Sequence, residues 1–247
     1  MARRDGVLVV AGPWHDMDHA RLELLTLMAE HEGLRVRVAE GYAPAMLDTA
    51  DLLVTYTCDV MPDDAGLDAL ERFLARGGRW FALHATNARL VLEQGAPVRC
   101  PPLPPRLRAM LGSQFAAHPA PARFKVSTAA PDHPLVAGVG AFFVEDELYL
   151  QDVDTGATVL LTCAFTGRTP LFARADWDEP AHPVMSLRDH GPGGVLYLTL
   201  GHTRGRHDMR PLTDAYPFVE RGSWPHPVFR DLLRRGLLWA MRAAPYA

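Results

Sequence analysis

The stretch from Asp51 to Leu83, DLLVTYTCDVMPDDAGLDALERFLARGGRWFAL, contains one complete strand–helix–strand unit. Asp51 to Thr57 is rich in β-forming residues, and Arg79 to Leu83 is a second short apolar segment. Between them, Leu67 to Ala75 has helical spacing and is followed by Gly77-Gly78, which is a typical helix end. A connection of this length joins parallel strands, because antiparallel neighbours need only a tight turn.

The same alternation of strand and helix precedes this unit. Gly6 to Ala11 (GVLVVA) predicts a buried strand, Ala20 to His31 a helix, and Leu34 to Glu40 another strand. Repeated units of this kind indicate an α/β fold with a mostly parallel sheet and helices on both faces. We therefore expect a flavodoxin-like three-layer sandwich, formed by a single domain over residues 1–247.

The second half of the chain departs from this regularity. Residues 95–135 are rich in proline and predict an insertion that shapes a pocket, with a short helix at Leu107 to Leu111. A Gly-Pro-Gly-Gly turn at 191–194 predicts a hairpin, and Pro227 to Ala244 predicts an amphipathic helix whose apolar face would allow a homo-oligomer. Further strands are expected at 124–128, 148–151, 157–163, 184–188 and 195–200.

Composition excludes several classes of protein. The chain has 247 residues, 48% hydrophobic residues and a net charge of −4, which fits a globular protein and does not favour a nucleic-acid partner. Cys58, Cys100 and Cys163 are too few and too widely spaced for a disulfide framework or a thiolate zinc site. The first apolar run, Val7 to Val10, is too short for a signal peptide or a membrane span. We expect a cytoplasmic protein without a membrane partner.

Polar side chains follow the predicted parallel strands where each strand ends. Because ligands of such sheets bind at the carboxyl ends of the strands, these residues are the first candidates for a site. They are Trp14, His15 and Asp16 after the first strand, Cys58 after the third, His84 and Asn87 after the fourth, and His202 and Arg204 after the last.

His84 is the most suggestive of these residues, since a sharp turn from strand to helix would expose its side chain. A structural role in the turn is the alternative, because many histidines are purely structural. Cys58 is either a nucleophile or a small buried apolar residue. His15 and Asp16 are candidate catalytic residues lining the pocket, with a hydrogen-bonded turn as the alternative, and Trp14, Asn87 and Arg204 are candidates for substrate contacts. Six histidines are expected in surface or loop positions: His19, His31, His182, His190, His207 and His226.

The order of these motifs resembles the ThuA-like (trehalose utilisation) family, which has the class I glutamine amidotransferase-like fold. The strongest parts of the resemblance are Glu145-Asp146-Glu147-Leu148-Tyr149 and Leu200-Gly201-His202. The remaining parts are Trp14-His15-Asp16, the TYTCD segment ending at Asp59, Ala82 to Ala85, Gln114 to Pro119, His133-Pro134 and Trp239-Ala240.

The resemblance also implies that the chain is not an amidotransferase. Those enzymes place a nucleophilic cysteine where this chain has His84, and imidazole does not replace a thiolate in that chemistry. His84, His202 and His118 are then expected to hold a divalent metal, with zinc as the first candidate. Glu147 is expected to act on a proton, and Asp146 to orient a histidine. Tyr149 either packs in the core or binds a sugar hydroxyl.

The family implies a small sugar or sugar-derived substrate. The leading hypothesis is a metal-assisted enzyme that cleaves or isomerises a carbohydrate or keto-sugar derivative, because a carbonyl acidifies its neighbouring C–H and a metal polarises it. The alternative is a non-catalytic sugar-binding or accessory protein that partners a sugar dehydrogenase. A hydrolase that uses Cys58 is a third possibility.

Overall fold

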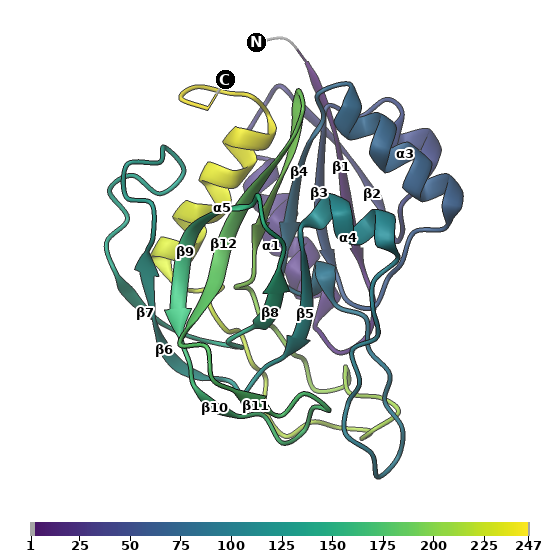
Figure 1. The fold of residues 1–247 in the computed structure, drawn as a ribbon. Coiled ribbons are helices and arrows are strands. Elements are labelled where there is room, and N and C mark those ends of the chain that lie inside the picture. The colour runs from purple at the N-terminus through teal and green to yellow at the C-terminus, as the bar shows by residue number, and fades with distance from the viewer. Residues whose placement is uncertain (1–2, 247) are drawn as a thin grey trace.

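The computed structural model describes residues 3–246, and most of its strands form one large mixed sheet (Figure 1). The strand order is β2-β1-β3-β4-β13-β12-β9-β6-β7. These strands are β2 (Leu34–Ala39), β1 (Arg4–Ala11), β3 (Leu52–Thr57), β4 (Arg79–Leu83), β13 (Gly193–Leu198), β12 (Ala181–His190), β9 (Thr158–Ala164), β6 (Ala122–Thr128) and β7 (Phe142–Asp146). Two short pairs lie beside it: β5 (Ser113–Ala117) with β8 (Leu150–Val153), and β10 (Gly167–Arg168) with β11 (Asp176–Trp177).

The sheet has a parallel half and an antiparallel half. The five strands from β2 to β13 run parallel to one another, and the pairings from β13 to β7 are all antiparallel. The prediction of a mostly parallel sheet is therefore wrong. It was based on the local strand–helix pattern of the first 83 residues, whereas β6, β7, β9 and β12 are joined by turns and loops.

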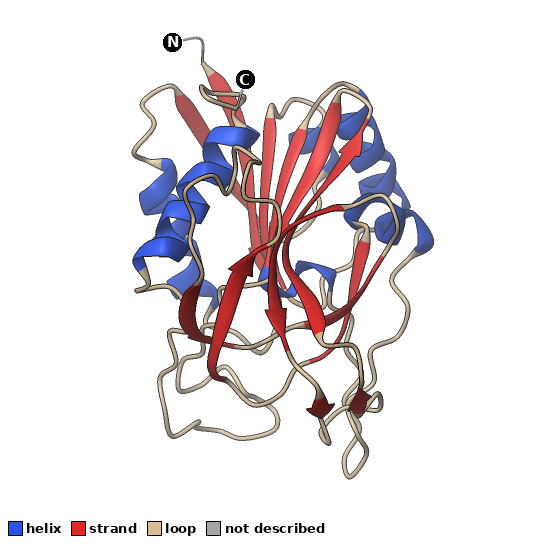
Figure 2. Cartoon of the chain, turned by 60° about the vertical axis from the view of Figure 1, so that its left-hand side comes forward, coloured by secondary structure: helices blue, strands red, loops and turns tan. Residues whose placement is uncertain are grey.

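Helices cover both faces of the parallel half (Figure 2). In β1, Leu8 and Val10 pack on one face with α1 (Met17–Met28) and α5 (Pro227–Ala240), while Val7 and Val9 pack on the other. The second face is covered by α2 (Pro44–Leu47), α3 (Asp64–Ala75) and α4 (Pro105–Leu111). Both faces of β1 are buried, which explains why it is an unbroken apolar run.

The predicted elements of the first 90 residues lie within a few residues of the observed ones, and β4 has the predicted bounds. The predicted strand at 148–151 begins two residues later, as β8. The turn at 191–194 joins β12 to β13 as predicted. Residues 95–135 are more regular than expected, since they contain β5 besides α4 and the predicted strand at 124–128, which is β6. The strands β5, β7, β10 and β11 and the helix α2 were not predicted.

The apolar residues of α5 pack against the sheet, and no large exposed apolar residue among those described lies on this helix. The helix therefore gives no support to the homo-oligomer, which stays a prediction. Within residues 3–246, no helix is long and apolar enough to cross a bilayer. All three cysteines are free, and the cytoplasmic location stays a prediction.

Candidate functional site

The chain makes a strained turn at His84, directly after β4. His84 has φ +47°, a left-handed conformation that is rare for residues with a side chain, and begins the short 3-10 helix η1 (His84–Asn87). Tyr197 donates a hydrogen bond to the carbonyl oxygen of His84, and Nδ1 of His84 lies 2.7 Å from the carbonyl oxygen of Thr199. The predicted sharp turn is present, but it places the His84 side chain in the interior and not in solvent.

A single buried carboxylate organises the other side of the site. Oδ1 of Asp146, at the end of β7, accepts hydrogen bonds from the backbone N–H groups of Glu147 (2.7 Å) and His202 (3.0 Å). Its Oδ2 accepts from the N–H groups of Gly201 and Ser223, both at 3.0 Å. Asp146 thereby fixes the backbone from which Glu147 and His202 project, and its oxygens are fully occupied in this role.

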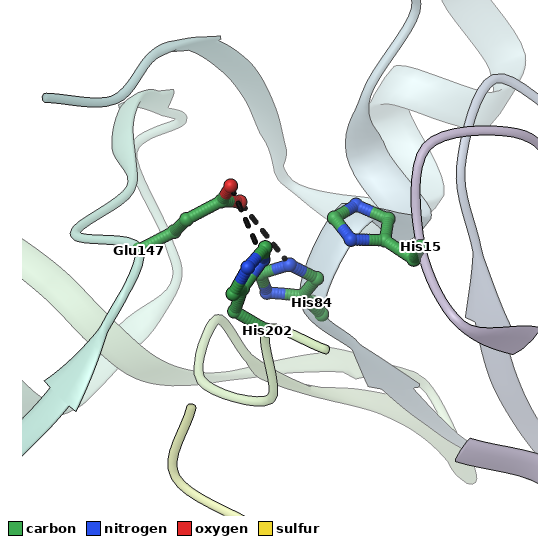
Figure 3. Close-up of side chains that lie close together, drawn as sticks. All are labelled: His15, His84, Glu147 and His202. Carbon is green, nitrogen blue, oxygen red and sulfur yellow. Dashed lines mark ion pairs between the residues drawn. The ribbon is translucent and has the colours of Figure 1, made fainter. Parts of the chain in front are cut away.

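These two supports bring four buried side chains together at the carboxyl ends of the parallel strands (Figure 3). His15 follows β1, His84 follows β4, His202 follows β13 and Glu147 follows β7. One ligand atom from each lies within 4.8 Å of the others. Glu147 Oε1 is 3.1 Å from His202 Nδ1, and Glu147 Oε2 is 3.5 Å from His84 Nε2. We call these four residues the histidine cluster.

The outer nitrogens of two cluster histidines are fixed by acceptors. The contact from His84 Nδ1 to Thr199 leaves Nε2 for the cluster, and the 2.7 Å contact from His202 Nε2 to Glu220 Oε2 leaves Nδ1. This is the arrangement that orients metal-binding imidazoles. Nδ1 of His15 is buried and makes no hydrogen bond, whereas Nδ1 of His202 has the Glu147 carboxylate beside it at 3.1 Å. Because a buried polar atom normally has a partner, the unpaired nitrogen of His15 fits a site built for a cation.

The charges of the cluster also fit a cation. Burial opposes ionisation of Glu147, but His118 and His202 outweigh it and hold the pKa of that carboxyl well below its usual range. Burial, together with the neighbouring imidazole of His84, lowers the pKa of His15 well below its usual value, so that the His15 imidazole is neutral. Burial also opposes protonation of His202, yet Glu147 and Glu220 raise its pKa to about 9. An ion bound here would displace that proton.

The cluster adjoins a cavity of about 430 Å³ that reaches the surface. His15, Glu147, Tyr149 and Arg204 contribute to its inner wall, and Trp14 and His118 line it as well. The Tyr149 hydroxyl lies 3.1 Å from His84 Nε2, and Arg204 pairs with Glu147 (3.4 Å) and with Glu220 (3.0 Å). A small molecule in this cavity would contact the cluster directly.

Several predicted site residues have other places. His118 Nε2 lies 3.7 Å from Glu147 Oε1 but is outside the histidine cluster, in which His15 stands instead. Asp16 caps the N-terminus of α1 and pairs with Arg221 at 3.0 Å. Asn87 is buried away from the cavity, where its amide nitrogen donates to Ser113 and Gln151. The predictions of a catalytic Asp16 and a substrate-binding Asn87 therefore have no support from their positions.

The structure favours the buried, non-nucleophilic alternative for Cys58 and corrects the expectation for His182. Cys58 lines the cavity, but burial raises the pKa of its thiol well above the usual value, which opposes the thiolate that a nucleophile requires. His182 was expected at the surface or in a loop, whereas it lies buried in β12 beside Trp177. The strand was predicted to begin only at residue 184, which left His182 outside it.

Glu220 is a site residue that sequence reasoning missed. It lies in a long irregular segment after β13. An isolated β-bridge between its backbone and that of Arg204 brings its carboxylate to Nε2 of His202. No motif or periodicity surrounds it. Its only signal in the sequence is an acidic side chain, which does not distinguish it among the 29 acidic residues of the chain.

The fold and the strand-to-helix turn at His84 define a class I glutamine amidotransferase-like protein. Within this class, residues 6–213 match the family model of ThuA, described as trehalose utilisation, and the chain belongs to that family. A search of curated proteins gave no match.

Solved structures of low sequence identity share the fold. A ThuA-like protein from Bacteroides uniformis ATCC 8492 has 16% identity and a TM-score of 0.66, over 97% of this chain and 92% of that one. A ThuA-like protein from Parabacteroides merdae ATCC 43184 has 14% identity and a TM-score of 0.64, over 98% and 92%. A β-galactosidase from Rahnella sp. R3 has 14% identity and a TM-score of 0.58, over 98% of this chain but 32% of its own.

Proposed function

We propose that the protein is a metal-dependent enzyme that cleaves or isomerises a carbohydrate or keto-sugar derivative. The observation that carries this proposal is the buried histidine cluster, whose three imidazoles and one carboxylate adjoin an open cavity. The family description, trehalose utilisation, supports a sugar as the substrate.

The cluster would hold the ion through His15, His84, His202 and Glu147. Three imidazoles and a carboxylate suit zinc first, although other divalent transition metals accept the same ligands. When bound, the ion supplies Lewis acidity toward a carbonyl or hydroxyl oxygen of the substrate. Because the pKa of Glu147 is held low, its carboxylate stays anionic at neutral pH and is better suited to binding a cation than to accepting a proton.

His118 is then the residue placed to move a proton. It lines the cavity, its side chain is partly open to solvent, and its Nε2 lies 3.7 Å from Glu147. Proton removal beside a carbonyl, or proton delivery to a leaving oxygen, both require such a group at the cavity wall. Tyr149 and Arg204 border the same space and can bind and orient the polar groups of a sugar. The sequence predicted a metal ligand at His118 and a catalytic residue at His15, and we propose the reverse assignment.

Elemental analysis after mild purification tests the metal. We expect close to one divalent ion per chain in the wild type and in His207→Ala, which changes an exposed histidine. The double variant His84→Ala/His202→Ala should contain almost none. A wild-type protein without metal that does not regain it when dialysed against zinc contradicts the proposal.

A second measurement separates an enzyme from a sugar-binding protein. His118→Gln should retain the ion and lose most of the turnover of keto-glycosides. A metal-loaded wild type that binds these compounds without converting any of them would favour the non-catalytic accessory role.

A further inference from the structure

The outer part of the cavity has a different character from its inner end. Polar groups gather near the histidine cluster, where Glu147, His118 and Arg204 lie. Toward the surface the wall is formed mainly by half-buried and exposed apolar side chains, which include Trp14, Leu90, Val98, Leu171 and Leu212. Phe172 is buried and lies deeper, beside His118. The cavity therefore has a polar inner end and an apolar outer end.

The apolar outer end is supported by hydrogen bonds between segments that are distant in the sequence. Val98 donates a backbone hydrogen bond to Leu171 (2.8 Å) and accepts one from Ala173 (2.9 Å), which joins the segment after η1 to the β10–β11 hairpin. Tyr216, which also lines the cavity, packs on Arg204 of the polar inner end, whose guanidinium lies 5.1 Å from the centroid of the tyrosine ring. These loops lie near the β10–β11 hairpin, at the lower end of Figure 1.

Two large apolar side chains stand open to solvent in this wall. Leu171 is 70% exposed and Leu212 is 58% exposed, and both line the cavity. Exposed apolar groups gathered around a cavity are typical of a ligand-binding surface, because a bound apolar group removes them from water.

This wall favours an apolar group over a second sugar ring. The hydroxyl groups of a second ring would lose their water against leucine and valine side chains and find few hydrogen-bond partners there. An aromatic or branched alkyl group has no such groups to satisfy and gains from burial.

We infer that the cavity takes a glycoside with an apolar aglycone, either an aryl or a branched alkyl group. The sugar lies at the polar inner end and the aglycone in the outer part of the cavity. The inference rests on the proposed function for the sugar half of the ligand, while the apolar half follows from the cavity wall itself.

Calorimetric titration of zinc-loaded protein with three probes tests this inference: phenyl β-glucoside, methyl β-glucoside and trehalose. We expect the phenyl compound to bind roughly tenfold or more tightly than the other two, as burial of most of a phenyl ring predicts. The double variant Leu171→Ser/Leu212→Ser should reduce that advantage to less than about threefold. Both side chains are exposed, so the variant should fold. Leu22→Ser, on the outer face of α1 and 64% exposed, is the matched control and should bind like the wild type.

Equal binding of the phenyl and methyl compounds, a preference for trehalose, or no binding of any probe would overturn the inference. The metal content of each sample is measured in parallel. A protein that holds its ion but shows no preference for the phenyl compound refutes the apolar subsite alone. A protein that holds no ion refutes the proposed function, and the phenyl-to-methyl ratio still decides the subsite.

Discussion

Replacing Asp146 with asparagine changes one oxygen of the site to nitrogen and leaves the size of the side chain unchanged. Each carboxylate oxygen accepts two backbone N–H groups, from residues 147 and 202 at one oxygen and from residues 201 and 223 at the other. Whichever way the asparagine amide is turned, its NH₂ group must face two N–H donors. The variant therefore loses two buried hydrogen bonds to a charged acceptor.

The expected cost follows from these two bonds. A hydrogen bond to a charged group contributes about 1.5–3 kcal/mol, so Asp146→Asn should lose about 3–6 kcal/mol of unfolding free energy. For a chain of this length each kcal/mol shifts the Tm by about 2–4 °C, so such a loss lowers it by about 6–24 °C. Because Glu147 and His202 project from the backbone that Asp146 holds, the folded fraction should also bind metal more weakly.

Thermal unfolding followed by circular dichroism, with metal analysis of the same samples, measures both effects. Asp214→Asn is the control, because its side chain is 96% exposed and its loss should change the Tm by about 1 °C or less. An Asp146→Asn protein that unfolds within about 2 °C of the wild type would show that this carboxylate does not organise the site as described.

Three further outcomes are expected. Gly222→Ala should lose at least about 1 kcal/mol of stability and most of the bound metal, because Gly222 has φ +45° and a Cβ there would collide with the carbonyl oxygen of His202. Gly138→Ala, with φ +75° in open space, is the control in thermal unfolding. Equal metal content in the two variants would contradict the clash. Metal-free protein should lose stability as the pH rises from about 6.5 to 9, because the pKa of His202 is raised in the folded state. The resulting stabilisation is present only while His202 is protonated. A Tm that stays constant or rises over this pH range would contradict a charged His202. Tyr149→Phe removes the hydroxyl that lies 3.1 Å from Nε2 of His84 and competes with an ion for that nitrogen. Zinc titration of the variant should therefore give an affinity equal to or higher than that of the wild type. A marked loss of affinity would show that the hydroxyl supports the ion.

The parallel half of the fold could be predicted because its pattern is local. Each strand from β1 to β4 is a short apolar run separated from the next by a helical segment or a glycine turn, and these signals lie within about 30 residues. β5 and β7 gave no such signal. The sequences SQFAA and FFVED become strands because they pair with β8 and with β6, and pairing between distant segments is not visible in a local pattern.

The candidate site was predictable to a similar extent. His84 and His202 could be placed from topology, since the carboxyl ends of neighbouring parallel strands meet at one edge. His15 follows a strand in the same way, and only the structure shows that its ring, and not that of His118, joins the cluster. Glu220 depended on the path of an irregular loop, which sequence patterns do not specify.

The two halves of the sheet have a consequence for how the protein matures. His15, His84 and His202 follow strands of the parallel half, whereas Glu147 follows the last strand of the antiparallel half. During synthesis, the fourth group of the cluster is made only when the chain has passed residue 202, and β13 must then insert between β4 and β12. Contacts so distant in sequence form slowly. A metal ion would therefore enter an almost finished fold, and its uptake would report the completion of folding and not guide its first steps.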